Sequence, residues 1–125
     1  GTIDPAAISS STLTATASTD YLYGYNVTIT EDSDFQIATG HTIDDVADGS
    51  VTAGSEEYGI MTSGAAGQYN AADTAITATE KTIAEHASSI ASQETNILFR
   101  ASADQTKTRA GAYSHTVTFT ATINL

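Results

Sequence analysis

The segment 111–125 at the end of the chain restricts the fold more than any other part of the sequence. From Tyr113 onward, one set of alternate positions is mostly apolar and the other set carries hydroxyl or amide groups. The first set is Tyr113, His115, Val117, Phe119, Ala121, Ile123 and Leu125, and the second is Ser114, Thr116, Thr118, Thr120, Thr122 and Asn124. An unbroken period of two, in residues of high strand propensity, predicts a β-strand with one buried and one solvated face. Such half-buried strands are typical of antiparallel sheets.

Several other segments alternate in the same way, and turn residues separate them. These segments are 12–19, 21–30, 56–61 and 96–103. Short strands at this spacing predict an all-β fold, an antiparallel Ig-like β-sandwich. A length of 125 residues is that of one domain, so we expect a single sandwich over residues 1–125.

The segment 75–95 gives two conflicting signals. Ile83, Ala87 and Ile90 have helical spacing, and Thr82 with Glu85 matches a capping box. The threonines that precede them favour a strand instead. A short helix near 83–91 is therefore one of two alternatives that the sequence leaves open.

The charge balance excludes two classes of partner. Four basic and fifteen acidic side chains give a net charge of -11. Nucleic acid and anionic membrane surfaces both require a basic face, so we expect neither as a partner. The chain has no run of about 18 apolar residues, which predicts no membrane insertion. A strongly negative chain also repels copies of itself and stays soluble until it assembles.

The closing strand and an earlier segment carry a family resemblance. Residues 110–122 resemble the pattern A-G-x-Y-x-x-T-V-T-x-T-x-T, and residues 18–29 resemble S-T-N-x-x-x-G-Y-x-x-x-I. Both patterns are found in secreted bacterial surface β-sandwiches: spore-coat-U-type and archaic chaperone–usher pilin domains, and Ig-like surface proteins of small-genome bacteria. Chaperone–usher pilins often have a disulfide, whereas this chain has no cysteine, so the Ig-like surface group is the better match. The resemblance implies a non-enzymatic protein, often one that assembles into filaments.

The residues themselves give no recognisable catalytic pattern. His41, His86 and His115 do not lie at metal-ligand spacing, and no G-x-S-x-G segment is present. His115, on the apolar face of the last strand, is expected to hydrogen-bond to backbone. We therefore expect no enzyme activity and no cofactor other than a metal ion.

Calcium is the one ion that the acidic loops favour. Asp44, Asp45 and Asp48, with Gly49 for a tight turn, offer oxygen ligands of the kind that Ca²⁺ prefers. The spacing differs from that of an EF-hand, and a solvated acidic loop is the alternative. Separately, Asn26-Val27-Thr28 is a glycosylation sequon, and Asn26 is expected to point away from the buried face.

These observations predict a structural subunit of an extracellular filament, pilus or surface layer, located at the cell surface after removal of a signal peptide. We expect a homopolymer in which a strand from one copy completes the sheet of the next, with a host surface or matrix as a further partner. Residues 1–12 are the predicted donor strand or N-terminal extension, with Ile3, Pro5 and Ile8 as its contacts. The alternative is a monomeric adhesin or carbohydrate-binding module.

Overall fold

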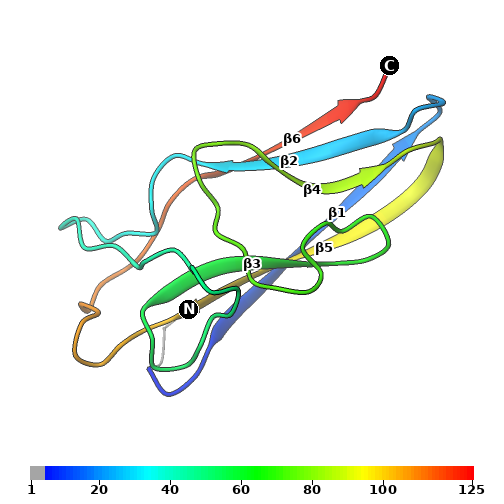
Figure 1. Ribbon diagram of the computed structural model, residues 1–125. Coiled ribbons are helices and arrows are strands. Elements are labelled where there is room, and N and C mark those ends of the chain that lie inside the picture. Colours follow the sequence, from blue (N-terminus) through cyan, green and yellow to red (C-terminus); the bar gives the residue numbers. More distant parts are fainter. Residues whose placement is uncertain (1–4) are drawn as a thin grey trace.

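The computed structural model describes residues 5–125, which form an all-β protein of two facing sheets (Figure 1). The strands are β1 (Ser9–Thr19), β2 (Tyr25–Glu31), β3 (Glu57–Ser63), β4 (Lys81–His86), β5 (Ile90–Ser102) and β6 (Val117–Ile123). One sheet has the order β1-β5-β3 and the other the order β4-β2-β6, and all pairs are antiparallel. The predicted all-β fold is confirmed, and the two layers are those of a β-sandwich.

The core lies between the sheets and consists mainly of β-branched side chains. The alternation in β2 places Tyr25, Val27 and Ile29 inside, where they are buried. The fully buried isoleucines are Ile29, Ile43, Ile60, Ile76, Ile83 and Ile97. Burying each of these side chains contributes about 1.5–3 kcal/mol. Ile43 and Ile76 lie outside the strands, so the long loops also supply the core.

The short helix near 83–91 is absent, and this alternative from the sequence is wrong. Strand β4 continues to His86, and β5 starts at Ile90. A register shift between Val27 and Thr28, where β2 pairs with β4, leaves Ile83 and the following alanine both buried. The β-branched residues of β4 favour the strand that pairs with β2. The helical spacing of Ile83, Ala87 and Ile90 therefore does not mark the buried face of a helix. Within residues 5–125 no helix exists that is long and apolar enough to cross a membrane.

One long side of the sandwich is closed by the chain itself. The loop after β3 returns over the gap between β3 and β4, where Thr74 pairs with Ile60 and Gly67 pairs with Ala84. Two further backbone bonds run from Thr62 N to Tyr69 O, at 3.0 Å, and from Gln68 N to Ile83 O, at 2.9 Å. This segment, residues 64–76, is called the closing loop below. It satisfies backbone groups on the edges of both sheets, which would otherwise be unpaired.

Candidate functional site: an open groove between two sheet edges

The opposite side of the sandwich has no equivalent of the closing loop. On this side the edge strands of the two sheets are β1 and β6. No strand of residues 5–125 pairs with their outer edges. Neither strand contains a charged residue or a proline. Natural proteins usually protect exposed edges with such residues, because a long uncharged edge is a template for pairing with another chain.

The side chains that β1 and β6 direct inward are only partly covered. Leu13 of β1 is 44% exposed and Ile123 of β6 is 48% exposed. Their register partners on the inner strands are Ile97 and Tyr25, which are 0% and 4% exposed. The core is therefore complete at the inner strands and unfinished along the β1/β6 side, which we call the open groove.

A hollow of about 380 Å³ lies at one end of the open groove, where β1 and β6 begin. Its lining combines the start of β1, the end of β5 and the start of β6. The lining residues are Ser9, Ser10, Ser11, Phe35, Tyr58, Phe99, Arg100, Ala101, His115 and Val117. Most of these side chains are apolar or carry hydroxyl groups, which suits an inserted strand with alternating side chains.

His115 is held at this end of the groove by three oxygen neighbours. Its Nδ1 lies 3.1 Å from the carbonyl oxygen of Ser33 and 3.1 Å from Glu31 Oε2, while its Nε2 lies 2.9 Å from the Tyr58 hydroxyl. Both neighbours of Nδ1 are acceptors, so Nδ1 carries a proton and donates to Ser33 O; in the neutral ring, Nε2 then accepts from Tyr58. The predicted backbone hydrogen bond of His115 is confirmed. Burial raises the pKa of Tyr58, and the nearby carboxylates of Glu31 and Asp45 add to the shift, so the phenol stays a donor.

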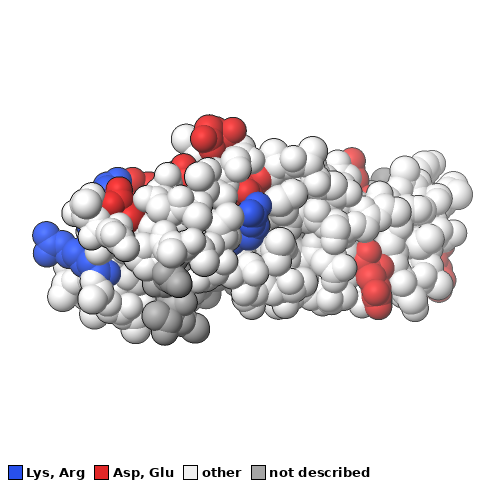
Figure 2. All heavy atoms as spheres, turned by 90° about the horizontal axis from the view of Figure 1, so that it is seen from below, with Lys and Arg blue, Asp and Glu red and all other residues white. Residues whose placement is uncertain are grey.

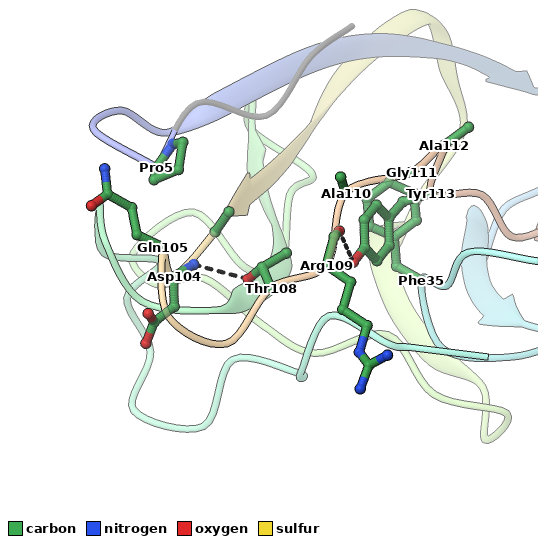
Figure 3. A pocket seen from close by; sticks show the side chains of 11 residues that line it. Pro5, Phe35, Asp104, Gln105, Thr108, Arg109, Ala110, Gly111, Ala112 and Tyr113 are labelled. Atoms are coloured by element: carbon green, nitrogen blue, oxygen red, sulfur yellow. Dashed lines mark hydrogen bonds between the residues drawn. The ribbon is translucent and has the colours of Figure 1, made fainter. Parts of the chain in front are cut away.

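A second hollow, of about 820 Å³, lies beside the turn that follows β5 (Figure 3). Tyr113 and Phe35 form its aromatic wall, and two hydrogen bonds join polar groups of its lining. The Tyr113 hydroxyl donates to the carbonyl oxygen of Arg109 at 2.7 Å, and the backbone N–H of Asp104 donates to the Thr108 hydroxyl at 2.9 Å. These bonds leave fewer polar groups to select a sugar or other small ligand.

The predicted donor segment is divided by the structure. Ile3 lies outside the described residues, while Pro5 lines the larger hollow and Ile8 is half-buried. Residues 9–12 belong to β1 and pair with residues 98–101 of β5 in the same chain. In the single molecule, therefore, only the part before Ser9 lies outside β1.

The predicted calcium ligands do not converge as a set of three. Asp44 pairs with Lys107, and Asp48 accepts a hydrogen bond from Ser50 N at 3.0 Å. Asp45 instead lies close to Glu31 and Asp34, which the sequence prediction did not include. The sequence did contain a signal for Glu31, because it continues the inward positions of β2 and so places a carboxylate in the core.

The remaining predicted positions have ordinary structural partners. Asn26 lies on the outer face of β2, and its side-chain amide donates to Asn124 Oδ1 at 3.2 Å. His41 contacts the buried Glu56 carboxylate at 2.9 Å, between Nε2 and Oε2. His86 Nδ1 lies 2.9 Å from the carbonyl oxygen of Ser88 in the turn after β4.

Charge is unevenly distributed on the face seen from below in Figure 2. Its Lys and Arg side chains lie between the left end and the middle, and the right half shows acidic side chains only.

The chain matches no protein-family model, no curated protein and no solved structure.

Proposed function

We propose that this protein is a structural subunit of an extracellular filament, pilus or surface layer, and that copies join by strand donation through the open groove. The observation that supports this most is that the chain covers the sheet edges on one side of the sandwich and not on the other. The closing loop pairs with both edges on one side. On the other side, no strand of residues 5–125 pairs with the outer edges of β1 and β6, and Leu13 and Ile123 are half-exposed. An unfinished core between two unpaired edges is what an inserted strand completes.

The dimensions of the N-terminal segment suit this role. Residues 1–8, fully extended, span about 26 Å, and the seven residues of β6 span about 23 Å. Because residues 9–12 already pair with β5, the donor in this proposal is restricted to residues 1–8. In an extended segment Ile3 and Pro5 share one face and Ile8 falls on the other, so Ile3 and Pro5 are the inward contacts.

Two variants separate the donor from the acceptor. Deleting residues 1–8 removes the donor and keeps the groove, whereas Ile123→Lys places a charge in the groove and keeps the donor. We expect each variant to be monomeric in size-exclusion chromatography and to form no fibres in electron micrographs. A 1:1 mixture should give heterodimers, because the deleted variant accepts the strand of the Lys variant.

The matched control is Thr120→Lys, which adds the same charge to β6 on its solvated face, where Thr120 is exposed. This variant should form fibres as the unmodified chain does. Fibres of the deleted variant would remove the donor assignment, and fibres of Ile123→Lys would remove the groove. An unmodified chain that stays monomeric at high concentration favours the alternative, a monomeric adhesin or carbohydrate-binding module.

A further inference from the structure

Three carboxylates from separate segments converge beside the end of the open groove. Glu31 is the last residue of β2, Asp34 lies in the turn that follows, and Asp45 lies in the loop before β3. One carboxylate oxygen from each lies within 4.8 Å of the other two. A parallel bridge between Asp45 and Tyr58 holds the loop in place, with Val46 N donating to Tyr58 O at 2.9 Å.

Glu31 is the unusual member of this group, because its carboxylate is buried without a hydrogen bond. The side chain is 4% exposed, and Oε2 accepts no hydrogen bond within the described residues. His115 Nδ1 lies 3.1 Å from Oε2, but its proton is directed to the carbonyl oxygen of Ser33. A buried carboxylate oxygen that accepts no hydrogen bond is disfavoured, and a bound cation would supply the missing partner.

Glu56 is also buried, but its carboxylate has hydrogen-bond and charged partners. Glu56 Oε2 accepts from the Thr108 hydroxyl at 2.7 Å and contacts His41 Nε2 at 2.9 Å, while Oε1 lies 3.5 Å from Lys107 Nζ. In residues 5–125, no lysine or arginine forms an ion pair with Glu31, Asp34 or Asp45. Lys81 acts on Glu31 and Asp45 only from a longer distance, so no close Lys or Arg partner balances the group of three.

We propose that Glu31, Asp34 and Asp45 bind a hard divalent cation, with Ca²⁺ as the best fit. The ligand atoms are all carboxylate oxygens, which Ca²⁺ prefers at about 2.3–2.6 Å. Oxygens on opposite sides of such an ion are about 4.6–5.2 Å apart, so a set within 4.8 Å can share one ion. A soft metal is disfavoured, because the chain has no cysteine and the Nδ1 of His115 is occupied.

The electrostatics of the three carboxyl groups reflect their burial and their closeness. Burial raises the pKa of Glu31 to about 7, and Asp45, Asp34 and Asp32 add to the shift. Burial also raises the pKa of Asp45. A bound cation would favour the ionised forms of both, and it would tie the end of β2 to the loop before β3.

This inference goes beyond the proposed function and is tested independently of fibre formation. The full chain is titrated with CaCl₂ in isothermal calorimetry, and with Tb³⁺ while tyrosine-sensitised luminescence is recorded, since Tyr58 lies beside the group. We expect one site with a Kd of about 10⁻⁴–10⁻³ M for Ca²⁺, the range of extracellular modules. Glu31→Gln, Asp34→Asn and Asp45→Asn should each weaken binding at least tenfold.

Asp48→Asn is the matched control, because it removes one carboxylate of the same loop outside the group. It should change the Kd less than twofold. Thermal melts provide a second measurement: CaCl₂ should raise the midpoint of the unmodified chain and leave that of Glu31→Gln unchanged. Absence of saturable binding, an equal loss in the control variant, or retained binding in all three site variants would each overturn the assignment.

Discussion

The buried carboxylate of Glu31 makes a prediction about stability that can be worked out from the structure. Its pKa in the folded protein is about 7 against an ordinary value of 4.5, chiefly because of burial. The folded state therefore holds this proton more tightly than the unfolded chain does. The contribution of Glu31 to the free energy of unfolding is fully present below the unfolded pKa of 4.5. It is lost as the pH rises from 4.5 to about 7.

The size of the effect follows from the shift. The full difference corresponds to at most about 3 kcal/mol. Solvent reaches the group through Asp34, which is exposed, so we expect about 1–2 kcal/mol after screening. Glu31→Gln removes the ionisable group and keeps the shape of the side chain. It should stabilise the metal-free protein by this amount at about pH 8 and hardly at all at about pH 4.

Urea unfolding in EDTA at the two pH values measures this difference directly. Asp45 also has a raised pKa and remains in both proteins, so the comparison measures Glu31 together with its interaction with Asp45. Asp48→Asn, which removes one carboxylate outside the group of three, is the control for the loss of a single negative charge. An equal effect of Glu31→Gln at both pH values, or a loss of stability at the higher one, would show that the ionised carboxylate has partners in the fold.

Four further substitutions test the packing. Ile97→Ala should cost about 3–4 kcal/mol in urea unfolding, whereas Leu13→Ala, at the opposite register position, should cost about 1 kcal/mol or less in the monomer; equal costs would mean that the groove is covered. Arg100→Met should cost about 3 kcal/mol, because Arg100 Nη1 lies 2.7 Å from the buried Asp73 Oδ2, and a loss below about 1 kcal/mol would contradict a buried pair. Gly24→Ala should lower the thermal midpoint and cost at least about 2 kcal/mol, since Gly24 has φ +77° and a Cβ would lie 1.7 Å from the last carbonyl oxygen of β4; an unchanged midpoint would contradict this close approach.

The sequence predicted the strands well where alternation alone decides the structure. The period of two predicted the inward side chains of β2 correctly, because it depends only on neighbouring residues. It also located the last strand, but β6 covers only Val117–Ile123 of the predicted segment, and Leu125 at its end is exposed. It also extended the second strand back to Tyr21, which is wrong: Tyr21 and Tyr23 are exposed in the turn before β2. Gly24 ends that turn with a positive φ, a conformation that the pattern of apolar residues does not reveal.

The open groove and the acidic group were beyond the reach of local patterns. Which strands are outermost depends on pairing between segments far apart, such as Leu13 with Ile97. The same holds for the carboxylates, since Glu31 and Asp45 come together through the bridge between Asp45 and Tyr58. The calcium prediction relied on acidic residues that are close in the sequence. It therefore included Asp44 and Asp48, which bind other partners.

The closing loop has a consequence for the architecture of any assembly. Since it covers one flank, the described residues leave one flank for a foreign segment, and in the proposed assembly each copy would accept one strand. Units that each give one strand and take one strand can only grow as unbranched lines with two chemically different tips. Growth from such a line is directional, and a single terminator molecule without a strand to give would stop one tip and leave the other active.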